Sequence, residues 1–154
     1  MKKSVLILFA LSGLILAACS SSTGSTPTSD AATRSLNSAT PTAANLTRTN
    51  DEAMVTVKVT PLNLDDRSAE VLTFSVVLDT HSVELDYDLK SIGALSTDTG
   101  ETVQPTDWTG PPGGGHHKEG VLAFPSLKNR GQSLTLVLRG IAGVPERQFI
   151  WKVK

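Results

Sequence analysis

The chain has 154 residues, 39% of them hydrophobic and 19% charged, and a formal net charge of −1 at pH 7. This length suits one domain of ordinary size once leader and linker segments are set aside. The weakly acidic balance disfavours nucleic-acid binding, which needs basic patches, and a single cysteine excludes a disulfide within the chain.

The N-terminus has the layout of a signal peptide. Lys2 and Lys3 precede an apolar run over residues 5–16, which is too short to span a bilayer comfortably. The small residues Ala17 and Ala18 follow this run. We therefore expect residues 1–18 to be removed during export.

The sequence LAAC at residues 16–19 resembles the lipobox of bacterial lipoproteins. The resemblance implies that Cys19 carries acyl chains, palmitate among them, and anchors the protein in a bacterial cell envelope. Several chains hold a protein far more firmly than one, because each buried methylene contributes about 0.8 kcal/mol. Ser20 implies the outer membrane, on its periplasmic or surface face, if the cell has two membranes, and the outer face of the cell membrane otherwise. The alternative is an ordinary secretory signal followed by a chance cysteine.

Residues 19–50 have the composition of a linker. About half of residues 20–50 are Ser or Thr, so the stretch lacks the apolar area that offsets the entropy of ordering. We expect a disordered tether that reaches on the order of 30 Å by flexible-coil scaling. A glycosylated or partner-binding tail is the alternative.

Residues 51–154 form the predicted folded domain. Apolar and polar side chains alternate there, which is the period of a half-buried strand, and no helical period lasts beyond about a turn. Turn-forming residues separate the alternating segments. The predicted strands are residues 55–60, 72–78, 83–89, 92–96, 102–104, 120–124, 133–139 and 148–153.

Short strands at this spacing, without helices, predict an all-β fold. We expect an antiparallel β-sandwich of the immunoglobulin-like or fibronectin-like kind with about seven to eight strands. A small closed barrel is the alternative. The lack of paired cysteines argues against an antibody-type domain.

The segment GPPGGGHHKEG, residues 110–120, contains two of the three histidines. Its Pro and Gly residues exclude it from a strand ladder, so His116 and His117 lie where a loop enters a strand. His81 falls at a turn after an earlier strand. If both loops emerge at one end of the sandwich, the three imidazoles converge. With Asp79 or Asp107 they would supply the nitrogen and carboxylate ligands that Zn or Cu ions prefer.

Besides metal binding, two other interpretations of these histidines stay open: a structural role and contact with a ligand or partner. Neighbours in an extended chain point to opposite faces, so His116 and His117 share one ion only where the backbone kinks, which the glycines permit. A histidine at the base of a loop more often donates a ring N–H to a backbone carbonyl and pins the loop. The third interpretation is contact with an organic ligand or a partner protein, for which Trp108, Pro111 and Pro112 would form the surface.

Other motifs give weaker signals. Residues 98–100 spell the DTG of aspartic proteases, but their polar neighbours indicate a hairpin turn, and one carboxylate cannot form the shared-proton pair. Glu84, Asp86 and Asp88 lack the clustered loop oxygens of a calcium site and indicate a solvated face. Ser82 has no GxSxG elbow around it. We therefore expect no enzymatic activity.

Several segments together resemble a domain of uncharacterised bacterial lipoproteins that carries a GGHH loop. They are LDTHS at residues 78–82, Trp108, GGHH at residues 114–117, GVLAF at residues 120–124 and GVPERQFIW at residues 143–151. The resemblance covers nearly the whole folded domain and implies a lipid-anchored β-sandwich. It brings no activity, cofactor or substrate with it.

These features together predict a membrane-anchored lipoprotein of the cell envelope. Its β-sandwich is expected to be a non-catalytic binding or interaction module, with the membrane and an envelope protein as partners and no nucleic acid. The alternative is a metal-binding lipoprotein that holds Zn or Cu through His81, His116 and His117, with Asp79 as a further ligand.

Overall fold

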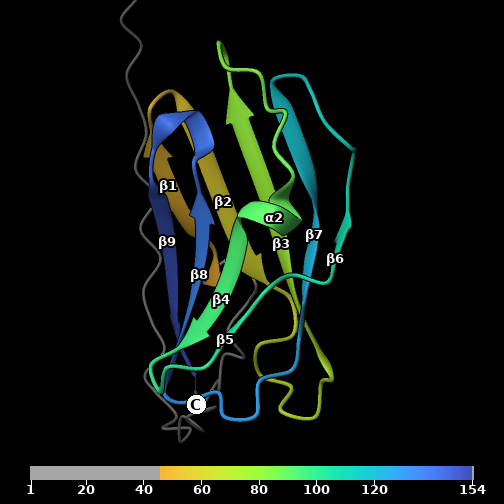
Figure 1. Ribbon diagram of the computed structural model, residues 1–154, viewed down its shortest axis with the longest axis vertical. Helices are drawn as coiled ribbons and strands as arrows, with labels where there is room; N and C mark the ends of the chain where they lie inside the picture. The colour runs from red at the N-terminus through yellow and green to blue at the C-terminus, as the bar shows by residue number, and fades with distance from the viewer. Residues whose placement is uncertain (1–45, 154) are drawn as a thin grey trace, which may run out of the picture. The chain divides into compact units, whose positions relative to one another are not determined.

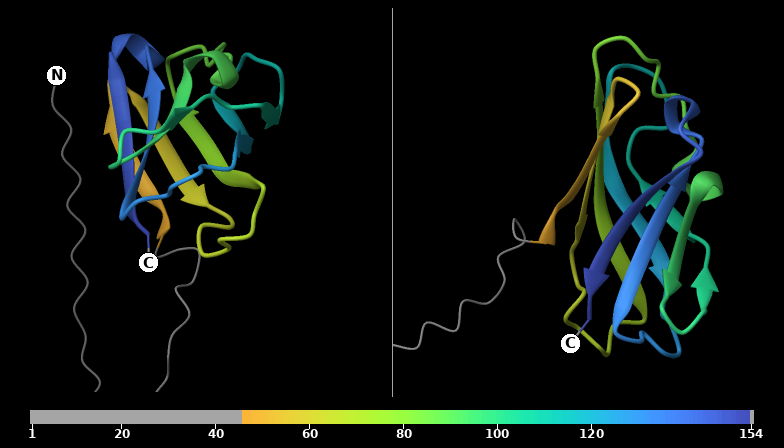
Figure 2. Two further views of the ribbon diagram at one scale, coloured as in Figure 1. Left: turned by 60° about the horizontal axis from the view of Figure 1, so that its bottom comes forward. Right: turned by 90° about the vertical axis from the view of Figure 1, so that its left-hand side faces the viewer.

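The computed structural model describes residues 46–153, which fold as two antiparallel β-sheets packed face to face (Figures 1 and 2). The predicted signal peptide, Cys19 and the linker up to residue 45 lie outside the described residues, as does Lys154. The strands are β1 (Arg48–Glu52), β2 (Val55–Pro61), β3 (Val71–Thr80), β4 (Gly93–Thr97), β5 (Thr102–Val103), β6 (Asp107–Thr109), β7 (His117–Pro125), β8 (Ser133–Arg139) and β9 (Glu146–Lys152). Two short helices, α2 (Leu89–Ile92) and the 3₁₀ turn η1 (Ile141–Gly143), lie between strands.

The strand order confirms the predicted sandwich. One sheet runs β1-β2-β3-β7-β6 and the other β5-β4-β8-β9. With β2 as the first strand, β2-β3-β7-β6 and β4-β8-β9 reproduce the ABED and CFG sheets of an immunoglobulin-like fold. Strand β5 extends the second sheet, and β1 is an added strand beside β2. The two sheets remain separate, so the closed barrel is excluded.

The core forms from the alternation that the sequence predicts. In β2 the inward side chains Val55, Val57 and Val59 are fully buried, while Lys58 between them is exposed. Strands β3 and β9 follow the same pattern, and β8 follows it except that Val137 is buried as well. Phe74 packs edge-on against Phe124 and tilted against Trp151, which joins the two sheets through their aromatic side chains.

The predicted strand over residues 83–89 is wrong. This segment is irregular and leads into the short helix α2, whose N-cap Asp88 accepts a hydrogen bond from the backbone of Lys90. The alternation does report burial correctly, since Leu85 and Leu89 are fully buried. The backbone of Leu85, however, donates to Gly115 in a loop instead of to a neighbouring strand. The alternation of apolar and polar residues therefore identified the side chains that point inward, but not the backbone group to which this segment is hydrogen-bonded.

Two strands were not predicted. Strand β1 is polar and carries no apolar alternation, yet it pairs with β2 along its whole length, from Arg48 opposite Val59 to Glu52 opposite Val55. The expected domain boundary at residue 51 thus falls inside β1, and Leu46 already packs against the core. The three-residue strand β6 pairs with β7. No helix within residues 46–153 is long and apolar enough to cross a membrane.

Buried cationic side chains close the ends of the core. Arg147 is 0% exposed and donates to the carbonyls of Val55 at 3.0 Å and Glu52 at 2.7 Å, and to the side-chain oxygen of Asn50. Burial lowers the pKa of its guanidinium, but arginine starts so high that it stays charged. Lys118 is 1% exposed and donates to the carbonyls of Tyr87 at 2.8 Å and Pro112 at 3.4 Å.

Replacing Arg147 by lysine should lower the free energy of unfolding by about 2–4 kcal/mol, because a lysine cannot reach all these buried carbonyls at once. The matched control is Arg139→Lys, since Arg139 forms an exposed pair with Glu146 that should contribute less than about 1 kcal/mol. Urea unfolding followed by tryptophan fluorescence measures both. Equal losses in the two variants would contradict the role given to Arg147.

Candidate functional site

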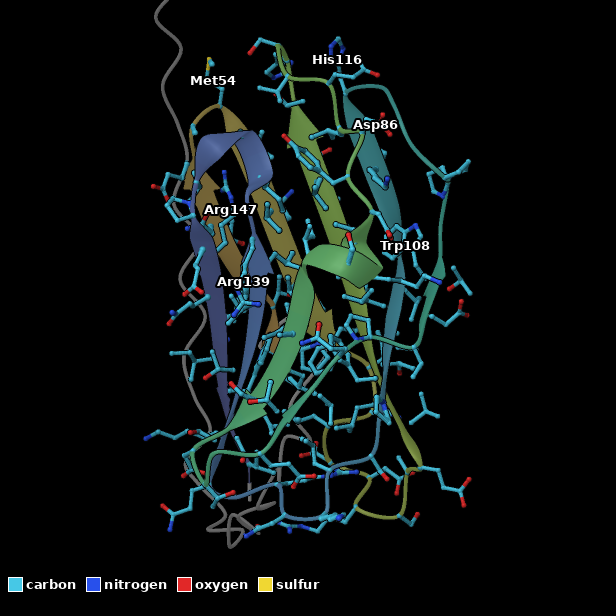
Figure 3. All side chains as sticks on the ribbon, viewed as in Figure 1. Met54, Asp86, Trp108, His116, Arg139 and Arg147 are labelled. Atoms are coloured by element: carbon cyan, nitrogen blue, oxygen red, sulfur yellow. The ribbon has the colours of Figure 1, made fainter. Side chains whose placement is uncertain are left out.

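An open depression of about 860 Å³ lies at one end of the sandwich. It lies between the turn of the β1–β2 hairpin and the loops that connect with β3 and β7. Figure 3 places Met54 and His116 at this end, on two different loops. The lining residues are Asp51, Met54, Thr56, Asp79, Thr80, His81, Ser82, His116 and His117. The three histidines and Asp79 thus line the same depression, which is the condition that the expected histidine cluster required.

The floor of the depression is a row of side chains across four strands. Strand register places Asp51 opposite Thr56, Thr56 opposite Asp79, and Asp79 opposite His117. All four lie on the solvent-facing side of their sheet, because the residues between them point into the core. Thr56 donates its hydroxyl to Asp51 at 3.0 Å. Directly opposite side chains are close enough to interact, so the row is a continuous polar surface.

Asp79 and His117 form the closest charged pair of the site. Nδ1 of His117 lies 2.5 Å from Oδ1 of Asp79 and donates to it, and Lys58 Nζ lies 3.6 Å from the other carboxylate oxygen. The hydrogen bond from His117, followed by the charges of His117 and Lys58, lowers the pKa of Asp79. The same hydrogen bond, with Glu119 Oε2 3.6 Å from Nε2, raises the pKa of His117. His117 thus binds a carboxylate rather than the backbone carbonyl that loop-pinning histidines commonly use.

The turn between β1 and β2 has an unusual backbone. Its two central residues, Ala53 and Met54, have φ angles of 48° and 63°. Positive φ at both positions is the type I′ form of the two-residue hairpin turn, and the residues that tolerate it are Gly, Asn and Asp. The turn is held by Thr80, whose hydroxyl donates to the Met54 carbonyl at 2.7 Å. As a result the Met54 side chain is 72% exposed at the rim of the depression.

The Gly-rich loop, residues 110–116 between β6 and β7, is attached to the segment that follows β3. Its Gly115 amide donates to the carboxylate of Glu84 at 2.7 Å, and its Gly115 carbonyl accepts from Leu85 at 3.0 Å. Gly114 and Gly115 have φ near +81° and +82°, which glycine adopts without strain. The His116 carbonyl accepts from the Thr80 amide at 2.9 Å. These bonds fix the backbone that carries His116 next to the one that carries His81.

The residues predicted as an apolar partner surface lie elsewhere. Trp108 is half-buried on β6 and donates its ring N–H to the Pro111 carbonyl at 3.3 Å. A methyl group added at Gly110 or Gly120 would collide with its ring, so the indole covers these two glycines. Pro111 and Pro112 are exposed but do not line the depression, and neither does Asp107.

The weaker motifs have structural roles. Asp98 of the DTG segment lies in the turn between β4 and β5, as predicted, and its carboxylate accepts a hydrogen bond from the Gln132 amide at 3.0 Å. Glu84 binds the Gly-rich loop and Asp88 caps α2. Glu84 and Asp88 therefore bind backbone amides separately.

Within residues 46–153, no three His, Cys, Asp or Glu side chains are arranged as a group that could hold a metal ion. The histidines share the depression without forming a ready-made set of three such ligands. Sequence reasoning did not include Met54, Thr56 or Asp51 in the site, because only the hairpin register brings them beside Asp79. The signal in the sequence that pointed to this part of the depression was Met54 itself, an isolated methionine next to polar residues.

Comparisons of the chain with protein-family models, with curated proteins and with solved structures return no match. The fold and the depression are therefore the features that bear on function.

The pKa of His117 should lie above its ordinary value of 6.5 and fall towards that value in an Asp79→Asn variant. The stabilisation from a raised histidine pKa is complete below 6.5 and is lost as pH rises through the folded-state pKa. The stabilisation from the lowered pKa of Asp79 is present above pH 3.8 and is lost as pH falls through the folded-state pKa of Asp79. Imidazole carbon and proton shifts measured by NMR against pH, with Asp107→Asn as control, give the titration. An unchanged His117 pKa in Asp79→Asn would disprove the pairing in solution.

Proposed function

We propose that this chain is a lipid-anchored lipoprotein of the bacterial cell envelope whose β-sandwich is a non-catalytic binding module. Cys19 is the lipidated residue, and the depression between the β1–β2 turn and the Gly-rich loop is the binding site. The supporting observation is that one end of the sandwich has an open concave surface lined by nine mostly polar residues. Immunoglobulin-like domains commonly bind through the loops at one end of the sandwich.

The contacts within the depression favour binding over catalysis. The hydroxyl of Ser82 lies 3.5 Å from the sulfur of Met54, while the imidazole of His117 binds Asp79. The hydroxyl and the imidazole thus have separate partners, whereas nucleophilic catalysis needs the base bound to the nucleophile.

The anchor is tested by labelling the full-length protein with radioactive palmitate in its native host. We expect label in the wild-type protein and none in the Cys19→Ser variant, because Cys19 is the only cysteine in the chain. The variant should also leave the membrane fraction, which immunoblotting of the two fractions measures. Absence of palmitate from the wild-type protein would exclude the lipid anchor.

The binding site is tested with a photo-crosslinking amino acid placed at Thr56 in the depression. The control position is Ile150, which is 51% exposed on the other sheet. We expect irradiation of intact cells to give a discrete crosslinked product from position 56 that is absent from position 150. Identical products from both positions would show that the depression is not the binding site.

Metal capture is the second candidate function. The observation that favours it is that His81, His116, His117 and Asp79 line one depression although they come from two separate segments. We expect the mature chain with Cys19→Ser to bind an ion among Zn(II), Cu(II), Ni(II) and Cu(I), and His116→Ala to weaken binding by at least about tenfold. Isothermal titration calorimetry measures the three divalent ions and chelator competition measures Cu(I), with Asp107→Asn as the matched control. Failure of all four ions to bind would exclude this candidate.

A further inference from the structure

We propose that the ion captured in the depression is Cu(I), that Met54 is its thioether ligand, and that one or two of the imidazoles of His81, His116 and His117 complete the site. This inference rests on the second candidate function, metal capture. It adds the oxidation state of the metal and a ligand from a third segment of the chain.

The Met54 side chain is placed as a ligand would be. The side chain is 72% exposed to solvent, so it contributes nothing to the hydrophobic core. It is held there by a turn in which the Met54 backbone adopts the left-handed conformation. Its sulfur lies 3.5 Å from the Ser82 hydroxyl, so it faces the depression. A glycine or an asparagine would form this turn with less strain than methionine does, which points to a use for the sulfur itself.

A chain of contacts connects Met54 to the three histidines. Ser82, which touches the Met54 sulfur, directly follows His81. Thr80, on the other side of His81, binds the Met54 carbonyl through its hydroxyl and the His116 carbonyl through its amide. The backbone segments that carry the sulfur and the three imidazoles are therefore hydrogen-bonded to one another around the depression.

The ligand set suits a soft ion of low coordination number. A structural Zn(II) site is tetrahedral with four ligands, and residues 46–153 offer no group of even three His, Cys, Asp or Glu side chains. Thioether sulfur selects Cu(I), and imidazole also suits copper. One sulfur and one or two imidazoles satisfy Cu(I) without a preformed cage.

His117 is oriented in the way that metal-binding histidines are. Its Nδ1 donates to Asp79 at 2.5 Å, and such a carboxylate fixes the ring. The nitrogen that remains for the metal is Nε2, which faces the exposed carboxylate of Glu119 at 3.6 Å. The ring is 59% exposed, so an ion has access to Nε2. Asp79 is then a positioning residue for the site.

The composition of the chain makes the sulfur ligand directly measurable. Met54 is the only methionine after the signal peptide, and Cys19 is the only cysteine. A mature chain with Cys19→Ser, prepared from a cleavable tag that leaves no methionine, thus contains one sulfur atom. We expect copper-edge X-ray absorption of this protein loaded with Cu(I) under ascorbate to show one sulfur scatterer with nitrogen scatterers.

Affinity is measured by competition with the Cu(I) chelator bathocuproine disulfonate. Met54→Leu should weaken Cu(I) binding by at least about tenfold. Its matched control is the double variant Met54→Leu/Leu62→Met, which keeps one exposed thioether but moves it to a position that does not line the depression, and it should bind as weakly as Met54→Leu. Unchanged circular dichroism and thermal unfolding identify variants that fold normally.

The outcomes separate this inference from the function on which it rests. Cu(I) binding with a sulfur scatterer, weakened in both Met54 variants and in His116→Ala, supports it. Binding of Zn(II) or Cu(II) that His116→Ala weakens, with no sulfur scatterer and no effect of Met54→Leu, overturns this inference and leaves metal capture standing. Binding of none of the ions overturns both.

Discussion

The structure depends on how the open ends of a β-sandwich are closed. The strand ladders satisfy the backbone within each sheet, but the loops at the ends have carbonyl groups that the core would bury without partners. Arg147 and Lys118 supply donors for these carbonyls from inside the fold, Arg147 on the β1–β2 hairpin and Lys118 on the loops at Tyr87 and Pro112. Arg130 does the same for the loop between β2 and β3, where it donates to Leu64 and Ala69. Each of these cations binds carbonyl oxygens, so the desolvation of its charge is offset by several hydrogen bonds at once.

This closure leaves several outward-facing side chains exposed at the end that carries the depression. Arg147 and Lys118 bind the hairpin and the Gly-rich loop from inside the fold, and among the residues that line the depression Thr80 also has a structural role, since it holds the Met54 carbonyl. Met54 and His117 are exposed, and an ion or a partner would meet them already ordered. If the depression binds a ligand, its position on strand ends and hydrogen-bonded loops means that little entropy is lost on binding.

Charge in the depression is balanced locally. Asp79 lies between Lys58 and His117, and His117 lies between Asp79 and Glu119, so the charges alternate across the outer face of the sheet. The groups are substantially exposed, and solvent screens their attraction. Their main effect is therefore on the orientation and protonation of the His117 ring, which matters for any ligand that approaches Nε2.

The sequence by itself determined which side chains point inward, because strand alternation records burial residue by residue, as in Val55, Val57 and Val59. It also determined that the Gly and Pro residues before His116 form a loop and that residues 98–100 form a turn, since these depend on local backbone preferences. It did not determine that residues 83–89 are irregular or that the polar strand β1 exists, because both depend on hydrogen-bond partners far along the chain: Gly115 for the first, and β2 with Arg147 for the second. Only the tertiary structure placed Met54, Thr56 and Asp51 beside Asp79 and the histidines. The physical reason is that cross-strand register, which no local pattern encodes, decides which outward-facing side chains become neighbours.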